Sequence, residues 1–273
     1  MIDKKLNEAL KSQYSPEGSE VRELQMRMLE MLKYIDKFCT EHDIKYWLAY
    51  GSCLGAVRHE GFIPWDDDMD IEMLREDYDK FVSLRKEFEN DQFVLQDHIS
   101  DDEYITPFPK IRDKNSYVKE VHNRDKYFKH NGVFIDLFVR ERNTFIAQRI
   151  SHIAQYVSYI LTDINNNMIR KIIKHTIYLG LHNLLFPILN IYNKLSSNRN
   201  LLHPGLGYGF YKSINRKNLF PLKRMQFENG MYPIPGNYED YLTRLYGDYM
   251  KIPDNKEDFR IHFKIVDLNR KHQ

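Results

Sequence analysis

Hydrophobic residues recur along residues 20–42 at the spacing of one helical face. The apolar positions on that face are Val21, Leu24, Met28, Leu32, Ile35 and Cys39. Intervals of three and four residues predict an amphipathic helix with one buried side. Apolar runs and alternation predict strands over 46–50, 69–74, 93–96 and 133–139, and further helices are predicted over 53–59, 77–88 and 238–246. Pro and Gly mark residues 12–19 as a flexible lead-in and residues 232–236 as turn-rich. The pattern predicts an α/β protein.

Residues 144–226 differ from the rest of the chain in charge. They contain 11 Lys and Arg against a single acid, Asp163, and the run 176–193 has no charged side chain. Such a run is consistent with a transmembrane helix, with a buried pair of helices, or with a helix lying at an anionic lipid surface. Pro187 and the polar His182 argue against a span.

Composition narrows the class of protein. Hydrophobic residues make up 42% of the 273 positions and aromatic residues 14%, which is enough for a sizeable core and excludes general disorder. A net charge of +1 argues against a nucleic-acid binder that works by bulk charge. With only Cys39 and Cys53, the chain has no disulfide framework. The charged N-terminal residues lack the apolar stretch of a secretory signal, so we expect a cytoplasmic protein.

The acidic segment 66–70 contains the most informative chemistry. Asp68 and Asp70 are two positions apart and alternate with the apolar Met69 and Ile71. In a strand this spacing puts both carboxylates on one face while the apolar neighbours enter the core. Two carboxylates held so close repel each other unless a cation lies between them, and a hard divalent ion such as Mg²⁺ takes oxygen ligands.

A third acid and a glycine–serine pair extend this site. Asp136 is a lone carboxylate inside the apolar run 133–138, where burial without a partner would be costly. Pairing across the sheet with the ion held by Asp68 and Asp70 would resolve that cost. Upstream, Gly51 and Ser52 are predicted to form the turn between a strand and a short helix, which offers N–H groups and a hydroxyl to phosphate. Together these features favour metal-assisted transfer at phosphorus.

Residues 66–70 and 205–209 each have a less specific explanation than a phosphate or metal site. A solvated acidic turn would account for residues 66–70, but the lead-in Ile63-Pro64-Trp65 and the apolar alternation argue against it. An EF-hand is excluded because Ile71 stands where that loop requires glycine. The glycines of 205–209 do not form GxGxxG and are predicted to lie in a loop.

The run that begins at Gly51, GSCLGAVRHEGFIPWDDDMDI, resembles the signature of the LicD family. That family includes bacterial phosphocholine transferases and, more distantly, the fukutin-type ribitol-phosphate transferases. The resemblance is strongest over about 20–84, continues through 108–114 and 132–138, and returns weakly near 246–253. Residues 144–218 match no motif of the family.

The resemblance implies a nucleotidyltransferase-like core, a mixed sheet with helices, carrying a helical insertion. Gly51 and Ser52 would hold phosphate, Asp68 and Asp70 would bind Mg²⁺, with Mn²⁺ as the alternative, and Asp136 would bind the metal or take the acceptor proton. Ser52 stands where the family commonly has Thr, and its hydroxyl preserves the chemistry. The implied units are a catalytic core over 20–143, a basic and largely helical insertion over 144–226 for acceptor or membrane-surface contact, and a C-terminal segment over 227–273 packed on the core.

The family's reaction transfers a phospho-alcohol from a CDP-alcohol to a sugar hydroxyl and releases CMP. For this chain the resemblance implies phosphocholine transfer from CDP-choline to a cell-envelope glycan, either a teichoic acid or lipopolysaccharide. The glycan would still be linked to a lipid, and the reaction would take place at the inner face of the cell membrane. Arg58 and Lys110 are candidates for the diphosphate, and Trp65 for the quaternary ammonium. Alternatively Lys110 is a solvated strand-edge charge and Trp65 a core residue. His59 either binds substrate or orients Asp66.

Four other functions are compatible with these residues. The same site would suit another CDP-alcohol, such as CDP-ribitol or CDP-glycerol, or an NTP-dependent nucleotidyltransferase. A nucleotide-sugar transferase also uses a D-x-D pair, but the preceding Gly51-Ser52 favours phosphotransfer. An inactive membrane-associated scaffold is the non-enzyme alternative, and the presence of all three acids argues against it.

Overall fold

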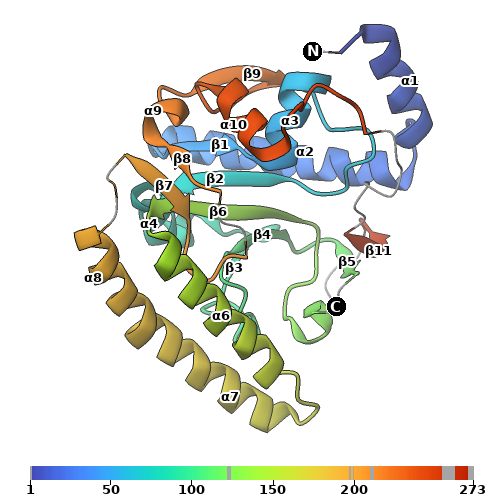
Figure 1. Cartoon of the computed structure of the whole chain (residues 1–273). Coiled ribbons are helices and arrows are strands. Elements are labelled where there is room, and N and C mark those ends of the chain that lie inside the picture. Colours follow the sequence, from blue (N-terminus) through green and yellow to red (C-terminus); the bar gives the residue numbers. More distant parts are fainter. Residues whose placement is uncertain are drawn as a thin grey trace.

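A mixed β-sheet forms the centre of the molecule (Figure 1). The computed structural model describes residues 2–121, 124–196, 198, 200–209, 212–253 and 262–269. The sheet runs in the order β1 (Tyr46–Leu48), β2 (Asp70–Leu74), β6 (Phe134–Arg142), β4 (Lys110–Asp113) and β3 (Phe93–Gln96). At the far end of β6, β7 (Leu201–Pro204) pairs beside it and β8 (Ile214–Asn215) pairs with β7. Strands β2 and β6 are parallel and their other neighbours antiparallel, which confirms the predicted α/β class.

The hydrophobic core lies between this sheet and α2 (Glu20–Glu41). All the predicted apolar positions of α2 except Val21 are buried, and the Ser19 hydroxyl caps the helix by accepting from the Arg22 N–H. The other helices near the core are α3 (Tyr50–His59), α4 (Arg75–Ser83), α5 (Arg85–Phe88), α9 (Arg216–Leu219) and α10 (Tyr238–Tyr246). Helix α3 follows β1 directly and begins beside the start of β2, where Asp70 lies, whereas α4 follows the opposite end of β2.

Two sequence predictions about local structure are wrong in part, although residues 15–19 and 235–236 do lie outside helices and strands. The proposed lead-in over 12–19 overlaps α1 (Lys4–Tyr14), whose first turn is capped by the Asp3 side chain. The turn-rich segment over 232–236 overlaps β10 (Gly230–Ile234), which forms a hairpin with β9 (Lys223–Phe227). A proline is tolerated in such a two-stranded ribbon because an edge position needs no donated N–H. A second ribbon pairs β5 (Tyr117–Glu120) with β11 (Phe263–Asp267), and η1 (Arg124–Tyr127) follows β5.

A helical hairpin projects along one side of the molecule (Figure 1). It consists of α6 (Phe145–Leu161) and an antiparallel helix of 30 residues made of α7 (Asn167–Gly180), the π turn η2 (Leu181–Leu185) and α8 (Phe186–Ser196). This helix is long and apolar enough to cross a membrane. The buried helix pair considered for this segment is contradicted, because many of its large apolar side chains are exposed. The division at 143 and 226 stays a prediction, and β7 and β8 of the main sheet lie between those bounds.

Candidate active site

Asp136 lies at the centre of a charged row that crosses three strands. Its register partner on the parallel strand β2 is Asp70, and its partner on the antiparallel strand β4 is Lys110. Neighbouring strands are about 4.8 Å apart, so the two carboxylates project side by side from one face of the sheet. Lys110 Nζ lies 2.8 Å from Asp136 Oδ1. Lys110 is thus an ion-pair partner of Asp136 rather than a solvated edge charge, and the pairing of Asp136 with an ion held by Asp68 and Asp70 stays a prediction.

Asp68 precedes this row in an extended segment. Strand β2 begins at Asp70, one residue later than predicted, but the alternation holds because Met69 and Ile71 are both fully buried. Asp68 and Asp70 accordingly line the same cavity. A third neighbouring acid, Asp66, lines it as well. The prediction from sequence did not include Asp66 among the site residues.

Gly51 and Ser52 lie in the first turn of α3 and not in a turn before it. The helix begins at Tyr50, three residues earlier than predicted, with Tyr50 itself at a φ of 43°. The Ser52 Oγ accepts a hydrogen bond of 2.9 Å from the Asp70 N–H, so its hydroxyl fixes the start of β2. A Cβ on Gly51 would lie 2.8 Å from Asp66 Oδ2. Gly51 therefore lets the helix approach the acids closely, and it lines the cavity itself, whereas the Tyr50 N–H donates to the Tyr241 hydroxyl.

Arg58 and Trp65 form the wall opposite the sheet. Arg58 is 3% exposed and donates to the main-chain oxygens of Tyr249 and Lys251. Burial, partly offset by Asp66, lowers the pKa of this guanidinium to about 10. The Arg58 Cζ lies 6.0 Å from the centre of the Trp65 ring, and both side chains line the cavity. Arg58 thus joins α3 to the C-terminal part of the chain at the edge of the site.

His59 has neither of the roles considered for it. Its ring is fully buried, with Nδ1 2.7 Å from Asn7 Oδ1 and Nε2 accepting from Arg58 Nε. It is not among the residues that line the cavity. His59 therefore supports Arg58 from behind and links α3 to α1.

All these walls enclose one cavity of about 1060 Å³. Of the eight predicted site residues, six line it: Gly51, Arg58, Trp65, Asp68, Asp70 and Asp136. The other two, Ser52 and Lys110, contact Asp70 and Asp136 from behind. The cavity is large enough for a nucleotide with an attached alcohol.

The acids strongly influence each other. Burial raises the pKa of Asp70 well above its ordinary value, and the charges of Asp68, Asp136 and Asp66 raise it further. The pKa of Asp66 is likewise raised well above normal, by burial and then by Asp68. Burial also raises the pKa values of Asp68 and Asp136, although Lys110 partly offsets the shift at Asp136. Burial and neighbouring acids therefore disfavour the ionised form of all four carboxyls, although Arg58, Arg140 and His262 line the same cavity.

His262 is a site residue that the sequence did not indicate. Its Nδ1 lies 2.6 Å from Asp67 Oδ1, and its Nε2 lies 3.4 Å from Asp68 Oδ2. Burial lowers the pKa of His262, but the hydrogen bond to Asp67 and the charge of Asp68 outweigh it, so the pKa is raised. Among the described residues, Asp67, Asp68 and His262 bring three ligand atoms within 4.8 Å of one another. No spacing rule links position 262 to 67, because only the fold brings them together.

Tyr50 and Arg140 also line the cavity without having been predicted. Arg140 follows Asp136 by four residues on β6 and pairs with Glu72 at 2.6 Å, while its NH2 donates to the Tyr50 hydroxyl. Glu72 follows Asp70 by two residues on β2, so this buried pair continues the acid row along the same face. The sequence contains a hint of this pair. Arg140 follows an apolar run, and Glu72 comes two positions after Asp70, so a buried ion pair between them could have been predicted.

The carboxylates of this cavity are the ligand type that a hard divalent cation prefers. Carboxylate oxygens of Asp68, Asp70 and Asp136 share one cavity, their pKa values are raised by burial, and Lys110 neutralises only one of them. Oxygen-only ligands are what Mg²⁺ and Mn²⁺ prefer. His262 offers a nitrogen on the Asp67 side, which Mn²⁺ accepts more readily than Mg²⁺.

Comparisons with known proteins agree with this geometry. Residues 43–165 match the family described as LicD/FKTN/FKRP, nucleotidyltransferase domain. The chain is 26% identical over 265 residues to the lipopolysaccharide cholinephosphotransferase LicD of Haemophilus influenzae, covering 89% of this chain and 95% of that protein. It is 39% identical over 56 residues to the human ribitol 5-phosphate transferase FKRP, covering 20% of this chain and 11% of that protein. The matched region 43–165 contains the acids of β2 and β6 and the start of α3, and the chain thus carries a LicD family domain.

Proposed function

We propose that this protein is a phosphotransferase that moves phosphocholine from CDP-choline to a sugar hydroxyl of a cell-envelope glycan and releases CMP. The observation that carries the proposal is the pairing of Asp70 with Asp136, beside Asp68, at the bottom of a nucleotide-sized cavity. The LicD relative, a lipopolysaccharide cholinephosphotransferase, supports the head group and the class of acceptor. Lipopolysaccharide is accordingly the first acceptor to test and teichoic acid the second.

The chemistry requires charge neutralisation and alignment more than covalent help. The acceptor oxygen attacks the phosphorus that carries choline, the bond from that phosphorus to the CMP oxygen breaks, and CMP leaves. A divalent ion, when bound, stabilises the negative charge that grows on the diphosphate. Asp68 and Asp70 would hold that ion, and Asp136 would hold it or accept the proton of the attacking hydroxyl. Lys110 keeps Asp136 oriented through their ion pair.

The cavity walls suit the two ends of the donor. The first turn of α3, at Gly51, offers main-chain N–H groups to the diphosphate. Trp65 offers an aromatic face in a cavity rich in carboxylates, and a quaternary ammonium is attracted by both. Arg58 already donates to two main-chain oxygens, so we assign it mainly to holding the wall and only secondarily to the diphosphate.

Location is part of the same proposal. We expect the CDP-alcohol donor to be in the cytoplasm. The glycan would then be modified at the inner face of the cell membrane, while it is still linked to lipid. The experiments below on the donor do not depend on that location.

Thermal unfolding with a panel of nucleotides tests the donor. The panel is CDP-choline, CDP-ribitol, CDP-glycerol, ATP and UDP-glucose, each with and without Mg²⁺. A ligand at about 100 times its dissociation constant adds roughly 2.7 kcal/mol to the free energy of unfolding, which is readily measured. We expect a Mg²⁺-dependent shift with CDP-choline. A shift with ATP or UDP-glucose but with no CDP-alcohol would overturn the proposed reaction.

CDP-ribitol is the second candidate donor, since the FKRP match covers part of the chain. CMP release from CDP-choline and CDP-ribitol in the presence of lipopolysaccharide, compared directly, separates the two. A preference for CDP-ribitol would keep the site residues and change the alcohol.

A further inference from the structure

We propose that the helical hairpin α6–α8 is a membrane-docking surface that lies flat on an anionic lipid bilayer. On α6, Ile146, Ile150, Ile153, Val157 and Ile160 recur every three or four residues and are all exposed, Ile153 by 58%. This spacing puts them on one face of the helix. The buried residues of α6, such as Gln148, Ser151 and Gln155, lie on its other side. The polarity of this helix is thus reversed relative to an ordinary surface helix.

The long second helix continues the same apolar surface. Ile172 and Leu179 precede the π turn, Leu184 lies within it, and Ile188 and Ile191 follow it, all exposed. Leu179, just before η2, and Leu184, within it, are five residues apart, which matches the period of a π turn. The π turn therefore keeps the apolar positions before and after it on one side of the helix. Soluble proteins seldom leave an apolar surface of this extent facing water.

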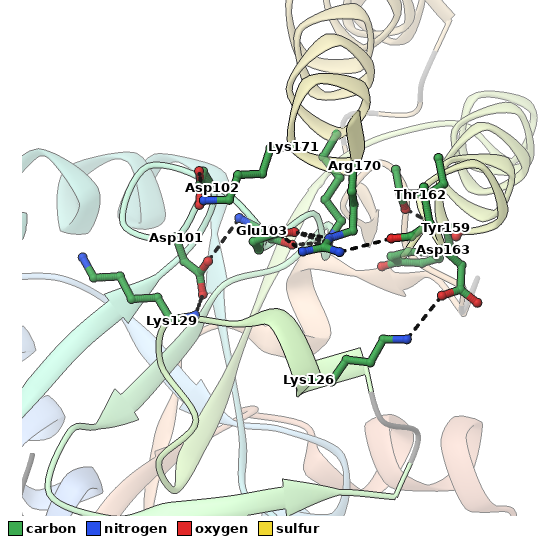
Figure 2. Close-up of polar contacts among 12 residues, drawn as sticks. Asp101, Asp102, Glu103, Lys126, Lys129, Tyr159, Thr162, Asp163, Arg170 and Lys171 are labelled. Atoms are coloured by element: carbon green, nitrogen blue, oxygen red, sulfur yellow. Dashed lines mark hydrogen bonds and ion pairs between the residues drawn. The ribbon is translucent and has the colours of Figure 1, made fainter. Parts of the chain in front are cut away.

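The hairpin is attached to the rest of the protein at both ends, so its long helix does not cross a membrane in this conformation. At one end Glu103 accepts from Arg170 and Lys174 in a buried cluster, and Lys171 pairs with Asp102 (Figure 2). At the other end Asn193 bonds the side chains of Asn143 and Thr144. These contacts join both ends of the 30-residue helix to the same globular body, which a transmembrane orientation would break.

The charges of the hairpin favour binding to an anionic bilayer over binding to the hairpin of a second copy of this chain. Arg149 follows Ile146 by three residues and precedes Ile153 by four, so it lies on the apolar face, and Lys194 follows Ile191 by three. Both are exposed. The only acid from 144 to 226 is Asp163, which lies in the loop between the helices. When the apolar face is buried in lipid, long basic side chains such as Arg149 and Lys194 can extend to the lipid phosphates at its edge. Two copies of this hairpin packed face to face would instead bring these like charges together.

Vesicle flotation tests the proposal with the intact protein. The probe is phosphatidylcholine vesicles containing about one third phosphatidylglycerol, compared with phosphatidylcholine alone, at low and at raised salt. We expect flotation with the anionic vesicles, weakened by salt. Leu184→Glu, at a position 64% exposed, should reduce binding about tenfold or more. Leu6→Glu is the matched control, because Leu6 is exposed on α1 far from the hairpin (Figure 1).

A second pair of variants tests the charge. Lys194→Glu should weaken binding to anionic vesicles, while Lys37→Glu, at an exposed position of α2, should not. Both pairs change exposed side chains, so unfolding temperatures near that of the wild type verify that each variant is folded.

Three results would overturn the proposal. One is a folded wild-type protein that does not float with anionic vesicles at low salt. Another is a wild-type dimer, measured by sedimentation, that Leu184→Glu dissociates while vesicle binding is absent, because the surface would then be covered by a second copy. The third is resistance to alkaline extraction from membranes, which would mean that the helix spans them. Vesicle binding requires neither nucleotide nor metal, so its failure is distinct from failure of the proposed transfer reaction.

Discussion

Asp70 and Asp136 are direct register partners on the parallel strands β2 and β6, although 66 positions separate them in the sequence. Two carboxylates in adjacent register on a rigid sheet cannot move apart to relieve their repulsion. The structure relieves it on one side only, through Lys110. The remaining negative charge is the reason we propose that a divalent ion binds at this position.

Replacing one of these acids should separate stability from activity. Burial and the neighbouring acids raise the pKa of Asp70, so its ionised form destabilises the folded state at neutral pH. Asp70→Asn should therefore raise the free energy of unfolding of the metal-free protein at neutral pH. It should also lower turnover about a hundredfold or more. Urea denaturation and CMP release measure the two effects, with the exposed Asp79→Asn as control.

The ion pair of Lys110 and Asp136 should be costly to break from one side. Lys110→Met leaves Asp136 without its cation in a buried position, and we expect a loss of about 3 kcal/mol in the free energy of unfolding. Lys110→Met combined with Asp136→Asn should recover most of that loss, because no uncompensated charge remains. Additive losses in the double variant would mean that the pair does not interact in solution.

Ser52 should act on stability as well as on the reaction. Ser52→Ala removes the acceptor of the Asp70 N–H and should lower the free energy of unfolding by about 1–3 kcal/mol. Ser52→Thr keeps the hydroxyl and is the matched control. If Ser52→Ala lost activity at unchanged stability, the hydroxyl would be a phosphate ligand alone.

His59 should make the protein less stable in mild acid. Burial, together with the charges of Arg58 and Lys11, lowers its pKa to about 3, below the ordinary value near 6.5. The unfolded state therefore binds a proton first as the pH falls, and the stability present above pH 6.5 is progressively lost toward pH 3. At pH 5 the loss from this residue is about 2 kcal/mol.

Urea denaturation at pH 7, 6 and 5 measures that loss. His59→Gln cannot titrate, so its free energy of unfolding should fall less steeply over this range than that of the wild type. Parallel pH profiles for the two proteins would contradict the assignment to His59.

Those parts of the site that depend on neighbouring residues in the sequence could be predicted. The alternation around Asp68 and Asp70 depends only on neighbouring residues, and the lone acid in the apolar run at 133–138 identified Asp136. The helix over residues 20–41 was predicted to within one residue, and β3 and α10 at their observed bounds, because their apolar periodicity is strong. The start of α3 was missed because Tyr50 has a left-handed backbone conformation that no pattern of hydrophobicity encodes.

Parts of the site that depend on distant segments could not be predicted. His262 joins the acids through Asp67, 195 positions earlier, and Lys110 meets Asp136 through strand register. The exposure of the hairpin was also undecidable from sequence, because a buried and an interfacial apolar helix have the same periodicity. What distinguishes them is the polar face of α6, where Gln148 and Gln155 bond main-chain oxygens of the core.

Arg58 joins two parts of the chain that are synthesised at very different times. It contacts the main-chain oxygens of Tyr249 and Lys251, and the cavity extends as far as His262, whereas the acids lie between residues 66 and 136. During translation the acids thus leave the ribosome well before the residues that enclose them. Until Tyr249, Lys251 and His262 have been synthesised, a nascent chain presents an open acidic surface, so the enclosed cavity forms only after that part of the chain is made.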